Sequence, residues 1–240
     1  MKKILIGIII LIFSFTYVCA ANSKNALAYY NAGDAKAVLK DYLEAIDDYS
    51  KAIELDPKYA AAYNNRGVAK DDLQNYTGAI KDYNKAIELN PKYAGAYYNR
   101  GLSKYNLQDY TGAIKDYNKA IEFNPKDAGA YYNRGIAKDN LQDYTGAIKD
   151  YTRAIELNTK YVDAYYNRGN IKAKLKDYKG AIKDYTKAIE LNPKYAEAYH
   201  NRGLAKYYSG DKHGALSDLK KAGELGDMTA YEAIQEISKK

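Results

Sequence analysis

An asparagine recurs every 34 residues along this chain, and an asparagine amide can both donate and accept hydrogen bonds. In five of the six copies, arginine and glycine follow it. The residue before each asparagine is Tyr30, Asn64, Tyr98, Tyr132, Tyr166 or His200. Amides beside tyrosine rings suit an extended peptide backbone, because tyrosine adds contact area at low entropic cost. The six asparagines are Asn31, Asn65, Asn99, Asn133, Asn167 and Asn201.

The arginine that follows each asparagine needs a partner, because a buried guanidinium group requires a carboxylate or strong hydrogen bonds. An aspartate recurs sixteen residues after the arginine. We interpret each pair as structural rather than functional, joining two helices of one repeat. The predicted pairs are Arg66 with Asp82, Arg100 with Asp116, Arg134 with Asp150, and Arg168 with Asp184.

No group of residues in the sequence has the spacing of a catalytic or metal site. His200 and His213 are the only histidines and have no recurring partner, so we expect them to be solvated or packed. Adjacent carboxylates such as Asp71 and Asp72 do not converge when they lie on a helix. The sequence has no glycine-rich phosphate loop, nucleophile elbow or ligand cluster. We therefore predict no enzyme activity, cofactor, metal ion or small-molecule substrate.

The strict period of 34 residues predicts a stacked array of supersecondary units instead of one large core. Each copy contains two helical patterns. In the copy over 94–127, we expect helices from about Gly95 to Leu107 and from about Thr111 to Phe123. Asp109 is a suitable residue to begin the second helix. Asn124-Pro125 ends that helix, because proline lacks an amide hydrogen and disfavours helix in the preceding residue.

This pattern resembles the tetratricopeptide repeat (TPR), whose consensus has Trp, Leu, Gly, Tyr, Ala, Phe and Pro in fixed register. The resemblance covers residues 26–229, although several large residues are replaced by more polar ones. It implies an all-α, right-handed superhelical solenoid of six TPR helix-turn-helix units with a C-terminal capping helix. In the copy over 60–93, the residues at these seven consensus positions are Tyr63, Arg66, Gly67, Lys70, Ala79, Tyr83 and Pro91, of which Gly67, Ala79 and Pro91 are identical to the consensus. The expected units are 26–59, 60–93, 94–127, 128–161, 162–195 and 196–229, with the capping helix at 230–240.

We number the positions of each repeat from 1, so that the recurring asparagine is position 6. The resemblance implies that positions 2, 5, 6, 9, 12 and 13 line a concave groove. The same asparagines and tyrosines can also bond to one another and hold the stack together, and both interpretations can apply at once. The predicted peptide-binding residues are Asn65, Tyr98, Asn99, Tyr132, Asn133, Tyr166, Asn167, His200 and Asn201.

The expected groove is acidic although the whole chain has a formal net charge of +7. TPR domains that clamp a terminal carboxylate carry lysine at positions 2 and 5 and lysine or arginine at position 6, and this chain has none there. We therefore expect a neutral-to-basic peptide that contacts tyrosine. At positions 2, 9, 12 and 13, the basic residue is Lys174 and the acidic residues are Asp34, Asp71, Asp72, Asp139, Asp163 and Glu197. Lysines at position 11 leave the acidic interpretation open, namely Lys36, Lys70, Lys104, Lys138, Lys172 and Lys206.

The first 20 residues have the order of a secretory signal peptide, with Lys2 and Lys3, an apolar run over 4–13 and small residues near Ala20. We expect cleavage after Ala20 or, as a second choice, after Ala21. The mature protein is then exported, either periplasmic or secreted, as a bacterial protein of the TPR type.

Two alternatives concern the same segment. One is an uncleaved anchor. The other is lipid attachment to Cys19, which would make the chain an envelope-attached lipoprotein in cell-envelope assembly or regulation. Lipoprotein processing sites usually carry a small residue before the cysteine and leucine three before it, whereas this chain has Val18 and Thr16. A membrane partner is expected only with lipidation.

Charges of both signs alternate through the sequence, so we expect no nucleic-acid partner. The prediction is a non-catalytic interaction scaffold for a protein or peptide partner.

Overall fold

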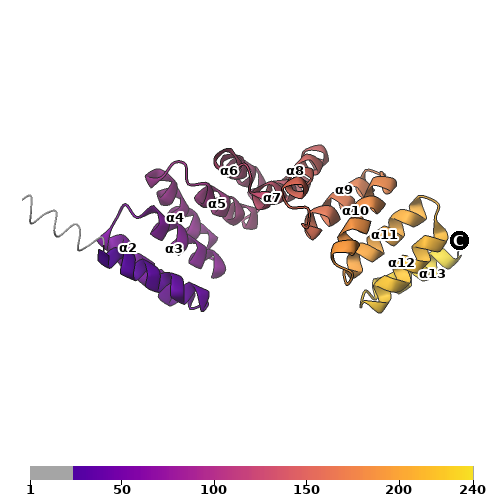
Figure 1. Ribbon diagram of the computed structural model, residues 1–240, viewed down its shortest axis with the longest axis horizontal. Helices are drawn as coiled ribbons and strands as arrows, with labels where there is room; N and C mark the ends of the chain where they lie inside the picture. The colour runs from indigo at the N-terminus through magenta and orange to yellow at the C-terminus, as the bar shows by residue number, and fades with distance from the viewer. Residues whose placement is uncertain (1–23, 240) are drawn as a thin grey trace, which may run out of the picture. The chain divides into compact units, whose positions relative to one another are not determined.

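The computed structural model describes residues 24–239, and every regular element in that part of the chain is an α-helix (Figure 1). The chain divides into two compact halves, an N-terminal half (Met1–Pro125) and a C-terminal half (Lys126–Lys240). In the N-terminal half, a helix over 24–38 precedes α2 (Tyr42–Leu55), α3 (Ala60–Asp72), α4 (Tyr76–Leu89), α5 (Ala94–Asn106) and α6 (Tyr110–Phe123). The C-terminal half contains α7 (Ala128–Asn140), α8 (Tyr144–Leu157), α9 (Val162–Lys174), α10 (Tyr178–Leu191), α11 (Ala196–Tyr208), α12 (Lys212–Glu224) and α13 (Thr229–Lys239).

Consecutive helices pack as hairpins, and each hairpin packs on the next within its half. The hairpins are α3 with α4 and α5 with α6 in the N-terminal half, and α7 with α8, α9 with α10 and α11 with α12 in the C-terminal half. In the copy over 94–127, the two helices begin one residue earlier than predicted, and the second ends at Phe123 as predicted. The predicted all-α repeat architecture is confirmed.

A short turn followed by a side-chain cap begins each second helix from α4 to α12. Before α6, Gln108 adopts a left-handed backbone with φ of 62°, which reverses the chain direction. The Asp109 carboxylate then accepts a hydrogen bond of 2.9 Å from the backbone N–H of Gly112. This bond satisfies one of the donors that a helix start leaves without an intrahelical partner. At the other end of α6, Asn124 leaves the helical conformation, with φ of −135° and ψ of 82°, directly before Pro125, as the sequence predicts.

A glycine against a buried tyrosine fixes the close approach of the two helices in the hairpins of α3 with α4, α5 with α6, α7 with α8 and α9 with α10, whereas Gly203 of the last hairpin faces Leu219. A Cβ atom on Gly101 would lie 2.8 Å from the ring of Tyr117, which is fully buried. The same contact joins Gly135 to Tyr151 at 2.7 Å. Any side chain at this glycine would push the helices apart, at a cost of about 1–3 kcal/mol.

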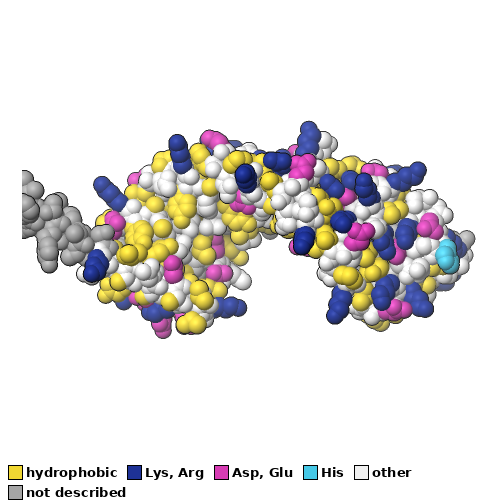
Figure 2. Space-filling model, in the orientation of Figure 1, with side chains coloured by type: hydrophobic (Ala, Val, Ile, Leu, Met, Phe, Trp, Pro, Cys, Tyr) yellow, Lys and Arg dark blue, Asp and Glu magenta, His cyan; other side chains and the backbone are white. Residues whose placement is uncertain are grey.

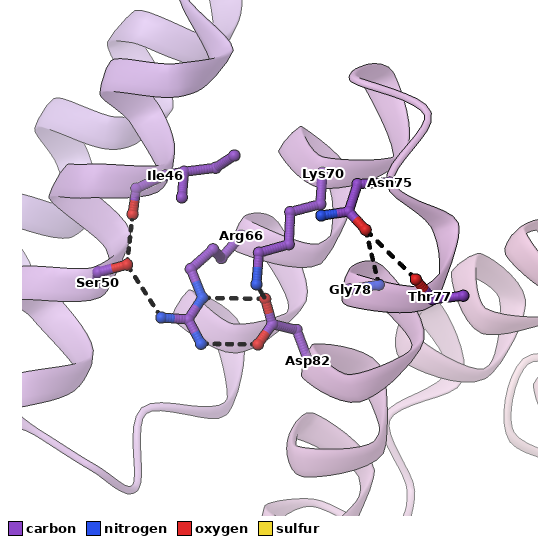
Figure 3. A network of polar contacts seen from close by, with 8 residues as sticks. All are labelled: Ile46, Ser50, Arg66, Lys70, Asn75, Thr77, Gly78 and Asp82. Atoms are coloured by element: carbon purple, nitrogen blue, oxygen red, sulfur yellow. Dashed lines mark hydrogen bonds and ion pairs between the residues drawn. The ribbon is translucent and has the colours of Figure 1, made fainter.

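The predicted arginine–aspartate pairs are confirmed, and each belongs to a larger network. Figure 3 shows the network of Arg66 and Asp82. Arg66 donates from Nε and Nη2 to the two oxygens of Asp82, at 2.9 and 2.7 Å. Its Nη1 donates to Ser50 of the preceding repeat at 3.0 Å, and the ring of Tyr63 covers its guanidinium group. One arginine therefore joins both helices of its own repeat to the second helix of the repeat before it. A fifth pair, Arg202 with Asp218, repeats the arrangement.

The predicted capping helix is α13, and it covers the apolar face of the last hairpin. Ala230 and Ile237 are buried against Leu219 and Ala222 of α12. The predicted signal peptide and Cys19 lie outside the described residues. Among residues 24–239, no helix combines the length and the apolar character needed to span a bilayer.

We expect strong energetic coupling between Arg168 and Asp184, because their side chains are 15% and 3% exposed and share two hydrogen bonds. In a double-mutant cycle of Arg168→Gln and Asp184→Asn, the coupling should be about 1.5–3 kcal/mol of unfolding free energy, as for hydrogen bonds between charged groups. The matched control is the exposed pair Arg153–Glu156 on α8, where we expect no measurable coupling. Equal coupling in the two cycles would contradict the structural role of the buried pair.

Candidate functional site

The positions expected to line a groove surround hollows within each half, and we call the surface that they form in either half the groove face of that half. A hollow of about 460 Å³ between the helix over 24–38 and α3 includes Asp34 and Asp72 in its lining. In the C-terminal half, a hollow of about 390 Å³ between α9 and α11 includes Asn170. Another of about 540 Å³ lies between α11 and the α12–α13 connection and includes Glu197 and His200. Positions 2, 5, 6, 9, 12 and 13 all contribute to these hollows.

The asparagine at position 6 bonds to the tyrosine at position 5 of the preceding repeat. Asn167 donates from Nδ2 to the Tyr132 hydroxyl at 3.0 Å, and Asn201 donates to the Tyr166 hydroxyl at the same distance. Asn65 donates to the Tyr30 hydroxyl at 2.8 Å. These bonds hold successive repeats together, as one of the two interpretations of the sequence expects.

We call the row of position-6 asparagines the asparagine ladder. The side-chain carbonyl oxygens of this ladder are placed differently from its side-chain N–H groups. In the described part of the C-terminal half, the Oδ1 atoms of Asn167 and Asn201 accept no hydrogen bond from the protein, although both side chains are only half-buried. They can accept bonds from the N–H groups of a bound backbone. Asn167 and Asn201 therefore serve the stack through their donors and can serve a ligand through their acceptors, whereas Oδ1 of Asn65 accepts a bond of 3.0 Å from Asn64.

Tyrosine rings form the walls between these asparagines. The ring centroids of Tyr132 and Tyr161 lie 4.7 Å apart, and those of Tyr166 and Tyr195 lie 4.8 Å apart. In the N-terminal half, burial and then the negative charge of Asp34 raise the pKa of Tyr30 to about 12. Burial likewise raises the pKa of Tyr166. These hydroxyl groups therefore remain protonated at neutral pH and act as donors or acceptors, not as bases.

The predicted site residues are divided between the two halves. In the N-terminal half, Asn99 donates to Asn64 at 3.1 Å, because Asn64 replaces the usual tyrosine at position 5. Tyr98 lies beside Tyr117, with ring centroids 6.0 Å apart. All nine predicted residues are half-buried on the first helices of their repeats. The C-terminal half contains Tyr132, Asn133, Tyr166, Asn167, His200 and Asn201, and the N-terminal half contains Asn65, Tyr98 and Asn99.

The position-11 lysines do not contribute positive charge to the hollows. Each ammonium group bonds to the buried aspartate at position 23 of its own repeat, on the side that faces the second helix. For example, Lys172 lies 2.8 Å from Asp184. The sequence left open whether these lysines reach the groove, and the structure shows that they pair with the buried aspartates instead. The complete set of pairs is Lys36–Asp48, Lys70–Asp82, Lys104–Asp116, Lys138–Asp150, Lys172–Asp184 and Lys206–Asp218.

Several groove carboxylates are held by neutral donors. Asp71 accepts hydrogen bonds from the Tyr83 hydroxyl at 2.6 Å and from Ser103 at 2.7 Å. Burial raises the pKa of Asp71, although these two hydrogen bonds act in the opposite direction. In the C-terminal half, Asp139 instead pairs with Lys174 at 3.1 Å. Asp71 and Asp139 are thus part of the hydrogen-bond structure of the groove face.

His200 has a partner that sequence reasoning missed. Its Nδ1 atom lies 2.6 Å from Asp227, which stands in the slot that holds proline in four other repeats. Burial alone would raise the pKa of Asp227, but hydrogen bonds from Thr229 and His200 outweigh it, so the pKa lies below its usual value. The signal available in the sequence was Asp227 itself, because it replaces the proline that four other repeats have at this position. Within residues 24–239, no three side chains of His, Cys, Asp or Glu are grouped to hold a metal ion.

Family models of the tetratricopeptide repeat match most of the chain. A model described as TPR repeat matches residues 33–70, 72–108, 103–138 and 140–176. Two models described as tetratricopeptide repeat match residues 162–195 and 184–218. The chain belongs to the tetratricopeptide-repeat family. A search of curated proteins found no match for this TPR chain.

Several solved structures resemble this one. YrrB, described as a TPR protein with an unusual peptide-binding site, is 26% identical with a TM-score of 0.70, covering 78% of this chain and 97% of YrrB. MamA is 30% identical with a TM-score of 0.66, covering 72% of this chain and 94% of MamA. The first TPR of Spaghetti (RPAP3), bound to the HSP90 peptide SRMEEVD, is 32% identical with a TM-score of 0.50, covering 50% of this chain and 95% of that domain.

One repeat of this TPR protein lacks an acceptor that others provide beneath the groove face. The Tyr185 hydroxyl donates to Asn170 at position 9 at 2.8 Å, and the Tyr83 hydroxyl donates to Asp71 at position 12 at 2.6 Å. The repeat of Tyr117 has Leu102 and Tyr105 at these two positions. Among the described residues, the buried Tyr117 hydroxyl has no hydrogen-bond partner.

We therefore expect Tyr117→Phe to leave the free energy of unfolding unchanged or to raise it, because the change removes an unsatisfied polar group. The same change at Tyr185 should cost about 0.5–1.5 kcal/mol, as for loss of one hydrogen bond. Denaturant unfolding of the two variants and the unchanged chain gives the comparison. An equal loss at both positions would show that the Tyr117 hydroxyl is satisfied in solution.

Proposed function

We propose that this TPR protein is an exported, non-catalytic scaffold that binds an extended, neutral-to-basic segment of a protein partner along its groove face. The proposal has three parts, which are the charge of the ligand, the way its backbone is held, and the export of the protein.

The charge of the hollows carries the proposal. The position-7 arginines and position-11 lysines bond to buried aspartates, whereas carboxylates such as Asp34, Asp72 and Glu197 line the hollows. The basic side chains that line them, Lys174 and His200, are each paired with an aspartate. Figure 2 shows that Lys and Arg side chains lie interspersed with acidic ones over the face in view. A ligand segment with positive or neutral side chains complements this lining.

Hydrogen bonding along the asparagine ladder supports an extended ligand. The Oδ1 atoms of Asn167 and Asn201 recur with the repeat, as do the tyrosine walls beside them. A peptide backbone laid along the first helices could donate its N–H groups to these oxygens. Tyrosine then contributes contact area to whichever side chains face it.

The comparisons support a peptide or protein partner. YrrB is described as having a peptide-binding site, and the Spaghetti domain is bound to a peptide. The HSP90 peptide ends in an acidic segment, however, and this chain has no lysine or arginine at positions 2, 5 and 6. We therefore infer that the ligand of this protein has the opposite charge preference.

Charge reversal on the groove face should weaken binding. The probe is a peptide selected from a displayed library of random dodecapeptides on the chain from Ala21 onward, then synthesised with a fluorescent label. We expect Asp72→Arg or Glu197→Arg to raise the Kd about tenfold or more, because each places a positive charge beside a neutral-to-basic ligand. Both side chains are exposed, so the fold should tolerate the changes.

Matched controls place the same charge change on second helices. Asp47→Arg on α2 and Glu156→Arg on α8 should leave the affinity unchanged. Fluorescence anisotropy measures all four variants. If the groove-face variants bind the selected peptide as tightly as the controls do, the groove-face proposal is wrong.

Export rests on the order of residues at the amino terminus, with Lys2 and Lys3 before an apolar run and small residues around Ala20. We expect the intact mass of the protein recovered from a bacterial envelope or secreted fraction to correspond to a chain that begins at Ala21. A mass that begins at Cys19 with attached acyl chains would instead support the envelope lipoprotein. An intact leader would contradict cleavage.

A further inference from the structure

Two hollows of the groove face are lined by equivalent positions of different repeats and so can be compared directly. One lies between the first and second repeats in the N-terminal half, and the other between the fifth and sixth repeats in the C-terminal half. Each uses positions 9, 12, 13, 17 and 24 of one repeat and positions 6, 9, 10 and 13 of the next. The C-terminal hollow also includes Asp139 of the repeat before, whose charge is paired with Lys174. The substitutions between them therefore show what each hollow is adapted to bind.

The acceptor at position 9 is held in the same way in both hollows. In the N-terminal hollow, Oδ1 of Asp34 accepts bonds from the Tyr49 hydroxyl at 2.7 Å and from Asn65 at 2.9 Å. In the C-terminal hollow, Oδ1 of Asn170 accepts the corresponding bonds at 2.8 and 3.0 Å. A neutral amide thus provides the same two bonds. The negative charge of Asp34 is not required to hold the helices together.

The charge of Asp34 has no cation beside it within the described residues. The position-11 lysines of the helix over 24–38 and of α3 form ion pairs with other carboxylates. Lys36 pairs with Asp48 and Glu44, and Lys70 pairs with Asp82. Asp72 at the rim of the hollow adds a second carboxylate without an ion pair in this part of the chain. Leaving a half-buried carboxylate with neutral partners alone is unfavourable relative to pairing it with a cation.

The remaining walls of the N-terminal hollow are apolar. Val38 at position 13 is 82% exposed, whereas the equivalent residue of the C-terminal hollow is Lys174. Val68 and Ala37 continue the apolar wall towards Asp34. Lysine and arginine side chains suit a hollow with apolar walls and carboxylates, because each has an apolar stem and a positively charged end.

We propose that the N-terminal hollow binds a lysine or arginine side chain of the peptide on the groove face, with its cationic group at Asp34 and Asp72 and its stem against Val38 and Val68. This inference rests on the proposed function and specifies one ligand residue. The C-terminal hollow, with Asn170, Lys174 and Tyr208 at the equivalent positions, accepts a neutral side chain instead. The two hollows therefore differ in the side chain that each prefers.

The test combines a change in the protein with a change in the ligand. The probe is the labelled dodecapeptide selected on the whole mature chain. In that peptide each lysine is replaced in turn by norleucine and each arginine by citrulline, which remove charge but preserve length. Asp34→Asn reproduces the arrangement seen at Asn170, so the variant should fold, and its circular dichroism and melting temperature verify this. Asp47→Asn on the exposed face of α2 is the matched control.

We expect one basic residue of the peptide whose neutral replacement raises the Kd about tenfold or more for the unchanged protein and for Asp47→Asn. For Asp34→Asn, the same replacement should change the Kd less than about twofold, because the charge pair is already absent. Binding to the unchanged protein should also weaken more steeply with salt than binding to Asp34→Asn.

Two results would overturn the inference in distinguishable ways. If the selected peptide binds but its dependence on basic residues is the same with Asp34→Asn, the hollow does not bind a basic side chain, and the proposed function stands. If no selected peptide is sensitive to Asp72→Arg or Glu197→Arg, the groove face is not a peptide site, and both proposals fail.

Discussion

A carboxylate buried between the two helices of each repeat is the constraint on which this protein depends. Asp82 and its equivalents are 2–5% exposed and cannot remain charged at this depth without cations. Arg66 supplies a bidentate pair and Lys70 supplies a second ion pair. The first repeat has Ala32 in place of the arginine, yet Lys36 still bonds to its aspartate at 2.7 Å. Lysine is therefore the constant partner, and arginine adds the connection to the preceding repeat.

This network also decides the character of the opposite side of the first helices. Because the basic side chains turn towards the buried aspartates, the groove face retains carboxylates, amides and tyrosine hydroxyls. Many of these groups hold the stack as well: Asp71 accepts bonds from Tyr83 and Ser103 of different helices, and Asn201 joins two repeats. Stability and recognition thus share residues. Substitutions that change one oxygen or nitrogen atom, such as Asp34→Asn, therefore separate stability from recognition better than truncation to alanine does.

Differences between copies concentrate at a few positions of the groove face. Asn64 replaces a tyrosine and bonds to Asn99, and Leu102 and Tyr105 stand at the two positions where other repeats place an acceptor for the buried tyrosine. Val38 and Lys174 give equivalent hollows different walls. These substitutions leave the glycine–tyrosine contact and the arginine–aspartate pair unchanged in the repeats that carry them. A repeat array can therefore vary its ligand contacts without altering its helix packing.

By itself, the sequence determined the repeat, the helix pairs and the arginine–aspartate pairing, because these depend on short spacings that recur unchanged. Asn124-Pro125 marked a helix end, and Arg100 identified Asp116 as its partner from the repeated interval of sixteen residues. The sequence also indicated which positions face the groove. It did not decide the direction of Lys172, the partner of His200 or the use of the Asn167 amide in the stack. Only the tertiary structure decided these, because each depends on where an adjacent helix or repeat places a second side chain: Asp184 draws Lys172 away from the groove, Asp227 bonds to His200, and Tyr132 accepts from Asn167.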